Sequence, residues 1–398
     1  MIKYATVGFE VHRRWYPWMF FLMVFTFPFV STVSASEEVD ELRERIDELE
    51  SIVEDISEQV GSRTLVHSFD SLKFNIGGFL HTAYTYIDTD VDSDLISDPD
   101  SAGSFNRQNF ELLISATLNE DWSAFVATGF LRESDDAFVN GSRYAPEFNS
   151  KNKNPLIIGW VNYEHSDAFN IRTGRMITPH GIINVEHFPA TLLETEQPQF
   201  LRPFSGNTIF SNFSTGIQVH GSIFFDNGAD ASYAAYFTNT SSSPEDKASG
   251  LRAAVGAFDG AVEVGLNTFN GVRSETVDSY RGQGVDLKIS KGKLLWKSEY
   301  YKTSGEVEGN RIAAYTQPAW QITPKWIVFY RYDRLDSGDF IGTSVENVVG
   351  ANYLPFSNTR LRVTLTSKEF EGGVDENTGD RFVDVSARII QFSGTFSF

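Results

Sequence analysis

The end of the chain alternates between apolar and polar residues and stops on an aromatic one. One parity carries Phe392, Phe396 and Phe398, and the other carries Gln391, Ser393, Thr395 and Ser397. Such a strand presents one face to lipid and the other to water, as the last strand of a transmembrane barrel must. In a soluble domain the same uncharged aromatic edge would be an aggregation hazard. The feature therefore favours a transmembrane β-barrel over a soluble fold.

The first 35 residues have the layout of a secretory signal peptide. Lys3, Arg13 and Arg14 precede an apolar run at positions 15–33, and small residues at 33–35 suit cleavage before Ser36. The alternative is an uncleaved membrane helix, because the run is close to the minimum spanning length. Prolines 17 and 28 and the small-residue exit favour cleavage of residues 1–35.

Residues 36–61 form a separate heptad unit. Its apolar seam consists of Val39, Leu42, Ile46, Leu49, Val53, Ile56 and Val60, with mostly charged residues elsewhere. This spacing predicts a short coiled-coil helix that ends at Gly61, followed by a linker at 62–70. Three heptads are marginal alone, so oligomerisation must be supported by contacts elsewhere in the protein.

From residue 71 to 398 the period changes from 3.5 to 2. Phe110, Leu112 and Ile114 alternate with Asn109 and Glu111, and arginines alternate with Leu361, Val363 and Leu365. A packed apolar core could not accept unpaired arginines on one face, but a wet lumen could. The segment therefore predicts strands with one lipid-facing and one water-facing side.

Connectors alternate between short and long. The short ones contain turn residues and lie at 119–121, 166–168, 226–228, 258–260, 291–292, 323–324 and 355–358. The long ones are expected at 88–104, 133–154, 177–212, 240–249, 271–281, 303–310, 334–343 and 371–381. Seven turns and eight loops predict an all-β fold, a sixteen-stranded antiparallel transmembrane β-barrel.

The charge of the chain excludes one class of partner. The formal charge is −20, and cleavage of residues 1–35 removes three basic and one acidic residue, which leaves 30 basic and 52 acidic residues, or −22. So acidic a chain is not expected to bind nucleic acid. The absence of cysteine excludes thiol chemistry.

Three segments carry a resemblance to a known family. The stretches 106–108, 118–122 and 170–181, the last reading Gly174-Arg175 and Thr178-Pro179-His180-Gly181, resemble the phosphate-selective porin (O/P-type) superfamily, including relatives with an N-terminal coiled coil. The resemblance implies a homotrimer in the Gram-negative outer membrane, with the coiled coil in the periplasm. It also implies one pore per subunit, narrowed by the infolded loop at 177–212. It further implies contact with lipid and lipopolysaccharide, and reading of Phe398 by the barrel-assembly machinery.

Candidate site residues follow from strand parity and from the longest loop. The candidate pore-lining residues are Lys73, Arg107, Glu111, Arg172, Arg331, Arg360 and Arg362. The candidate constriction residues are Arg175, His180, Glu186, His187, Glu194, Glu196 and Arg202. Charged groups in a confined pore set ion selectivity through Coulomb attraction, although each arginine could instead pair with a carboxylate and stiffen the wall.

No metal site or cofactor is expected. The Asp-rich segment 88–100 has Ser93 and Pro99 where a calcium-binding loop needs Gly and Glu, so it reads as a solvated acidic loop. Loose divalent-ion bridging to lipopolysaccharide remains an alternative there. The histidine and glutamate spacing in 180–194 fits no zinc pattern.

The function predicted is passive diffusion of small hydrophilic solutes or ions across the outer membrane, without enzymatic activity. One rival is a barrel enzyme of the lipase or protease type, which would need a catalytic triad. No Gly-x-Ser-x-Gly motif is present. The other rival is a structural tether from the membrane to the cell wall through the coiled coil.

Overall fold

The computed structural model describes residues 73–92, 101–133, 156–186, 188–194, 196–202, 208–239, 247–273, 278–305, 309–338, 342–373 and 384–398. The predicted signal peptide, coiled coil and linker lie outside these residues, as does His187. The backbone of Arg107 is described, but its side chain is not. Among the described residues, no helix is both long and apolar enough to cross a membrane.

Sixteen strands account for most of the described chain. They are β1 (Lys73–Asp92), β2 (Ala102–Thr117), β3 (Trp122–Glu133), β4 (Leu156–Ser166), β5 (Phe169–Ile177), β6 (Phe213–Phe224), β7 (Asp230–Asn239), β8 (Lys247–Ala257), β9 (Val262–Arg273), β10 (Asp278–Lys291), β11 (Leu294–Gly305), β12 (Asn310–Thr323), β13 (Trp326–Asp336), β14 (Gly342–Phe356), β15 (Thr359–Gly372) and β16 (Asp384–Ser397).

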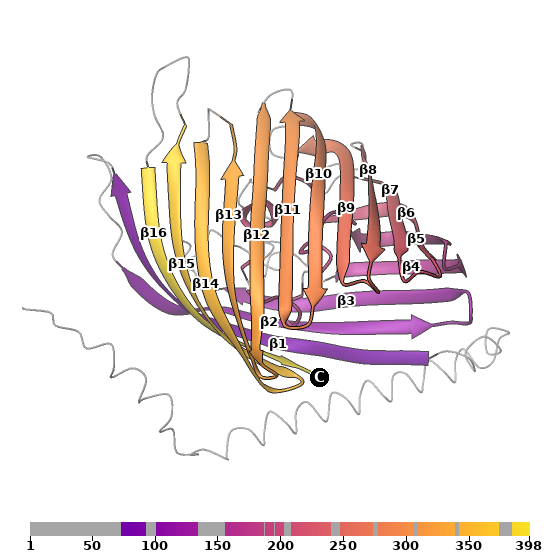
Figure 1. The fold of residues 1–398 in the computed structure, drawn as a ribbon, viewed down its shortest axis with the longest axis horizontal. Helices are drawn as coiled ribbons and strands as arrows, with labels where there is room; N and C mark the ends of the chain where they lie inside the picture. The colour runs from indigo at the N-terminus through magenta and orange to yellow at the C-terminus, as the bar shows by residue number, and fades with distance from the viewer. Residues whose placement is uncertain are drawn as a thin grey trace, which may run out of the picture. The chain divides into compact units, whose positions relative to one another are not determined.

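The strands form one closed antiparallel barrel (Figure 1). Each pairs with its neighbours in sequence, and β1 pairs with β16 to close the ring. Leu80 lies opposite Phe396 in this closing pair. The backbone N–H groups of Gly78 and Phe398 each donate to the other residue's carbonyl oxygen at 3.0 Å. The sixteen-stranded antiparallel barrel predicted from the sequence is confirmed.

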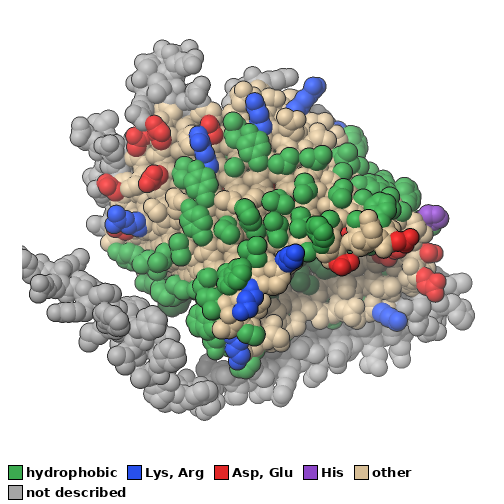
Figure 2. Space-filling view, viewed as in Figure 1, with side chains coloured by type: hydrophobic (Ala, Val, Ile, Leu, Met, Phe, Trp, Pro, Cys, Tyr) green, Lys and Arg blue, Asp and Glu red, His purple; other side chains and the backbone are tan. Residues whose placement is uncertain are grey.

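Alternation along each strand separates two chemically different faces. On β13, Phe329, Arg331 and Asp333 are buried toward the lumen, whereas Val328 and Tyr330 are exposed on the outside. Figure 2 shows hydrophobic side chains spread over the outer face, with charged side chains gathered toward the strand ends. This arrangement inverts a soluble core, because polar groups lie inside and apolar groups face outward.

The seven predicted short turns are all present between consecutive strands. Asn119 shows why such residues are used: its side-chain oxygen accepts hydrogen bonds from the N–H groups of Asp121 and Trp122 at 2.9 and 3.0 Å. In the β8–β9 turn, Phe258, Asp259 and Gly260 have φ values of 57°, 56° and 75°. The turn residues thus supply the side-chain bonds and left-handed backbone that tight hairpins need.

At several long connections the strands extend further than predicted. β1 continues to Asp92, so Asp88 and Asp90 are strand residues opposite Arg388 and Ser386, and not part of a loop. The predicted loop at 88–104 was wrong at both ends, since β2 begins at Ala102. The physical reason is that strands extend past the apolar belt, where the sequence loses its hydrophobic alternation.

Candidate functional site

The longest connection with described structure, residues 178–212 between β5 and β6, folds into the barrel. We call it the inner loop; its described parts are 178–186, 188–194, 196–202 and 208–212. Figure 1 shows this segment behind β11 and β12, within the ring of strands. Phe200, Leu201 and Ile209 have no exposed surface, and a 3-10 turn spans Gln199–Leu201. The described parts of this segment therefore fold inward, as predicted for 177–212.

The first attachment of the inner loop is a carboxylate on β11. Glu299 accepts the N–H groups of Ile182 and Ile183, both at 3.0 Å, and the hydroxyl groups of Tyr301 and Tyr315 at 2.7 and 2.8 Å. Gly181 has φ +68°, and a Cβ there would lie 1.9 Å from Glu299 Oε2. The close approach of loop and wall thus requires glycine at this position.

His180 completes this attachment. Asn267 Nδ2 donates to Asp286, so Asn267 Oδ1 is an acceptor, and it lies 3.3 Å from His180 Nδ1. His180 Nδ1 therefore carries the proton, and Nε2 accepts from the Tyr236 hydroxyl at 2.9 Å. Burial, with a smaller contribution from the nearby Arg252 cation, lowers the pKa of His180 to about 4 against the opposing effects of Asn267 and Asp286. The neutral ring is the form that fits this site.

We expect acid to weaken this attachment. Because the folded pKa is about 4 against an ordinary 6.5, the stabilisation is complete above pH 6.5 and is lost as pH falls toward 4. The loss amounts to up to about 3 kcal/mol. Thermal unfolding midpoints of the folded barrel should fall over this window, and His180→Asn, which keeps the donor to Asn267, should flatten that fall. An identical pH profile in the variant would contradict this role of His180.

Aromatic side chains fill the space between the inner loop and the wall. Phe200 and Phe210 of the loop pack with Phe269, Tyr301 and Tyr315, and ring centroids lie 5.3 to 6.1 Å apart. A buried aromatic ring of this size contributes roughly 1.5–3 kcal/mol through its removal from water. The loop is thus held by a small apolar core in addition to polar contacts.

Two lysines on the wall hold the middle of the loop. Glu186 forms ion pairs with Lys297 of β11 and with Lys288 of β10, the latter at 2.8 Å. Burial alone would raise the pKa of Glu186, but the two ammonium groups together lower it. Glu186 therefore remains a carboxylate and anchors the loop to this side of the barrel.

A larger charge cluster holds the loop on β13 and β14. Arg202 donates to both oxygens of Glu346, at 2.7 and 2.6 Å. Arg331 lies 2.6 Å from Glu194 and donates to the Glu196 carbonyl oxygen at 2.7 Å. The geometry of the Arg331–Glu194 contact does not allow a hydrogen bond, so the two groups interact only through their charges. Burial raises the pKa of Glu194 to about 7, against the attraction of Arg331 and Arg202. Paired charges thus replace the solvation that these groups lose.

Two arginines on β15 bind the backbone of the loop. Arg362 donates to the carbonyl oxygens of Pro189 and Leu192 and to the Thr395 hydroxyl, and Arg360 donates to the carbonyl oxygens of Thr191 and Leu192. A five-donor guanidinium suits this task because it can satisfy several carbonyl groups at once. The loop segment 189–192 is therefore fixed against β15.

Strand parity predicted that the side chains of the candidate arginines face the lumen. It did not predict that the inner loop would cover them. Arg331 and Arg362 are 1% and 4% exposed, so they contact the loop more than the solvent. Glu111 is also buried and accepts from Asn109 at 2.9 Å. Lys73 is exposed at the start of β1, and the Arg172 guanidinium lies 4.1 Å from the centroid of the Trp160 ring.

Arg175 is a correction to the predicted set of loop residues. It belongs to β5, where its Nε donates to the carbonyl oxygen of Ile157 at 3.0 Å and its guanidinium lies 5.6 Å from the Phe213 ring centroid. The other described members, His180, Glu186, Glu194, Glu196 and Arg202, are in the inner loop. The family-like Gly-Arg pair therefore lies near the end of β5, two residues before the strand gives way to the loop.

Sequence reasoning missed the wall carboxylates that hold the loop. Glu299, Asp333 and Glu346 are buried toward the lumen, and Asp333 accepts the N–H of Gln199 at 2.8 Å. The sequence feature that could have identified them is an acidic residue at a lumen-facing position of a strand with otherwise regular alternation. Within the described ranges, no group of three or more His, Cys, Asp or Glu residues is arranged to hold a metal ion.

No protein-family model matches the sequence, and no curated protein matches it either. Solved structures match the fold. An anion-selective porin from Comamonas acidovorans has 13% identity and a TM-score of 0.57, covering 82% of this chain and 100% of its own. The outer-membrane channel DcaP of Acinetobacter baumannii has 13% identity and a TM-score of 0.53, with 83% and 98% covered. OmpT of Vibrio cholerae, in a trimer form, has 12% identity and a TM-score of 0.52, with 83% and 100% covered.

These similarities cover 82–83% of this chain and lie well below 25% identity. They establish that the chain has the fold of sixteen-stranded porins. The proteins named above are porins, channels or outer-membrane proteins by description, and this chain covers 98–100% of each.

Proposed function

We propose that the protein is a passive diffusion channel for small hydrophilic solutes or ions. The observation that carries this proposal is a closed barrel with a polar lumenal wall, to which one loop is attached by ion pairs and carbonyl contacts. Burying polar groups on the inner wall costs free energy unless water or other polar groups form hydrogen bonds with them. A barrel that served only as a scaffold would have no need of such a polar wall. The inner loop would narrow the passage.

We further propose that it acts in the outer membrane as a homotrimer. The apolar outer face and the porin fold support this, as does the trimer form of the similar Vibrio cholerae protein. The predicted signal peptide at 1–35 would direct export, and the coiled coil at 36–61 would join the three subunits on the periplasmic side. The barrel-assembly machinery would act on the strand ending at Phe398. A relation to the O/P-type superfamily rests on the resemblance of 170–181.

The candidate lining residues divide into two groups. We propose that Lys73, Arg107 and Arg172 contact the solutes, while Glu111, Arg331 and Arg362 support the wall and the inner loop. Arg360, which binds the loop backbone and is only half-buried, would do both. The constriction would be formed by the loop residues His180, Glu186, His187, Glu194, Glu196 and Arg202. We propose no enzymatic activity and no cofactor.

Liposome swelling provides the test of diffusion. Reconstituted protein should admit a monosaccharide quickly and a trisaccharide slowly or not at all, because the inner loop reduces the passage. Liposomes with heat-denatured protein serve as the control. Swelling no faster than this control, from protein shown to be folded by its heat-modifiable gel mobility, would contradict the channel function.

A further inference from the structure

Six polar side chains lie together on the inner wall of β3 to β6, and we call them the lumenal platform. Strand register pairs Gln218 with Tyr236, which donates to His180 of the inner loop, so Gln218 faces the lumen. The same row continues through the register partners of Gln218 on β5, β4 and β3, and two further members lie two residues along their strands on the same face. The members are Ser123, Asn162, Glu164, Arg172, Gln218 and His220.

Four members form one chain of hydrogen bonds. Glu164 Oε1 accepts from the Ser123 hydroxyl at 2.6 Å and from Asn162 Nδ2 at 3.1 Å. Asn162 Oδ1 is therefore an acceptor, so His220 Nε2, which lies 2.8 Å from it, carries the proton. The Nδ1 atom of the neutral ring then presents a lone pair, and Glu164 retains its second carboxylate oxygen. The chain thus holds two further acceptor atoms in defined positions.

Arg172 is a cation that forms no hydrogen bond with the described residues. Its guanidinium lies 4.1 Å from the centroid of the Trp160 ring, and Phe125 stacks on that ring with centroids 5.6 Å apart. The Nε atom of Arg172 is buried and has no acceptor there. Glu164 is close enough to attract Arg172, but the two do not form an ion pair. Stacking therefore positions the guanidinium while its donors stay available to a solute.

Gln218 lies beside Arg172 and adds a buried acceptor. Its side chain belongs to a residue that is 5% exposed, and its Oε1 atom has no hydrogen-bond donor among the described residues. A buried carbonyl oxygen without a donor costs free energy, which a bound donor would recover. No member of the platform is hydrogen-bonded to the described parts of the inner loop, and Glu164 is exposed while Arg172 and His220 are half-buried. The platform is therefore open to the lumen.

We infer that the lumenal platform binds zwitterionic solutes of the α-amino acid type. The carboxylate of the solute accepts paired hydrogen bonds from Arg172, and its ammonium group donates to Glu164, to Gln218 Oε1 and to His220 Nδ1. Both charges of an α-amino acid are carried by one carbon atom, which suits a guanidinium and a carboxylate that lie near each other without pairing. A simple anion would leave the three acceptors unused and would be repelled by Glu164. The inference deepens the proposed diffusion of solutes and rests on it for access to the lumen.

The test measures equilibrium binding to the folded, detergent-solubilised oligomer by ligand-detected nuclear magnetic resonance. The probes are L-alanine, propionate, which lacks the ammonium group, and ethylamine, which lacks the carboxylate. The wild type should bind alanine about tenfold more tightly than either of the other probes, a factor that corresponds to about 1.4 kcal/mol for the second charged contact. Single-channel current in KCl, recorded from the same preparation, reports conduction separately.

Two variants distinguish the two charged ends of the platform. Arg172→Gln should weaken the binding of alanine and of propionate by about tenfold each, because both probes use the guanidinium. Glu164→Gln should weaken alanine by a similar factor but leave propionate bound as tightly as before or more tightly, because it removes a repulsive charge. Alanine has no net charge, so a general change in the charge of the lumen would not reproduce its loss. A general loss of fold would not spare propionate.

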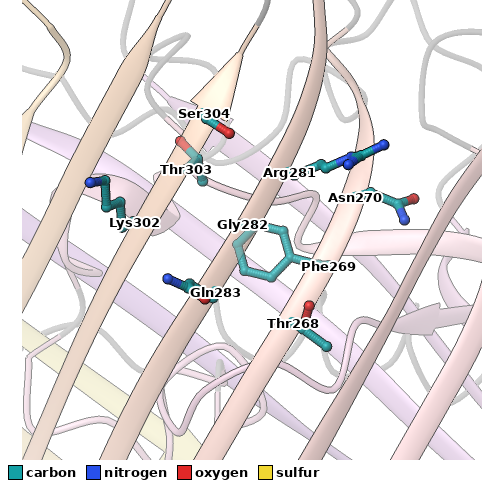
Figure 3. A pocket seen from close by; sticks show the side chains of 9 residues that line it. All are labelled: Thr268, Phe269, Asn270, Arg281, Gly282, Gln283, Lys302, Thr303 and Ser304. Atoms are coloured by element: carbon teal, nitrogen blue, oxygen red, sulfur yellow. The ribbon is translucent and has the colours of Figure 1, made fainter.

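The control is Arg281→Gln, which removes a cation from the outer face of β10, where Figure 3 shows it near Asn270 of β9. Binding of all three probes should stay unchanged in this variant. Alanine that binds the wild type no more tightly than propionate does, or that binds the wild type and both platform variants equally, would overturn the inference. If KCl current is present in that case, the channel stands and the platform alone is excluded. Alanine binding without KCl current would instead exclude the channel and retain the platform.

Discussion

Glu346→Gln is expected to destabilise the barrel by about 3–5 kcal/mol, the cost of leaving a buried charge without its partner. Glu346 is the carboxylate on which three cations converge: Arg202 at 2.6 Å, Lys368 at 3.3 Å and Arg331 at 3.7 Å. Its side chain is 2% exposed, so solvent cannot replace the lost charge. The measurement is denaturant unfolding of the refolded protein, followed by heat-modifiable mobility.

The control for this change is Glu369→Gln. Glu369 lies on the adjacent strand β15 but is exposed on the outer side. A substitution there should change the free energy of unfolding by no more than about 0.5 kcal/mol. Equal effects of the two substitutions would show that the Arg202–Glu346–Arg331 cluster does not hold the inner loop.

Glu299→Leu should release the start of the inner loop and cost at least about 4 kcal/mol. It removes the acceptor of two backbone N–H groups and two tyrosine hydroxyls, and each buried donor left unsatisfied costs about 1–3 kcal/mol. Because residues 182 and 183 would no longer be tied to β11, single-channel current should also become larger or noisier. Unfolding and bilayer recordings measure the two effects.

Glu299→Gln distinguishes the role of the side-chain oxygen as a hydrogen-bond acceptor from the role of the side chain's shape. Glutamine retains one side-chain oxygen, which can still accept the N–H groups of Ile182 and Ile183. Its cost should be less than half that of Glu299→Leu, with current close to that of the wild type. If leucine and glutamine had the same effect, the hydrogen bonds of Glu299 would not be what holds the loop.

Much of the barrel could be predicted because its signals are local. The alternation in a strand such as β13 and the side-chain hydrogen bonds of Asn119 depend on residues close in sequence. The error at Asp88 and Asp90 shows the limit of this signal. A strand that rises above the lipid needs no apolar face, so its residues resemble those of a solvated loop.

The attachment of the inner loop could be predicted only in part. The parity of Arg331 and Arg362 gave their lumenal direction, but their burial depends on Glu194 and Leu192, about 140 to 170 residues earlier in the chain. Glu299 shows the same limit, since its partners Ile182 and Ile183 carry no polar side chain. A hydrogen bond to a backbone N–H group does not depend on the partner's side chain, so such partners cannot be recognised from sequence composition or spacing.

Single-channel recording in a planar bilayer under a KCl gradient tests the central claim most directly. The folded wild-type oligomer should produce stepwise ionic current, in groups of three steps for a trimer with one passage per subunit. The sign of the reversal potential would then show whether arginines or loop carboxylates control the passage. A folded, heat-modifiable barrel that inserts into the bilayer and carries no current would show that the protein is not a diffusion channel.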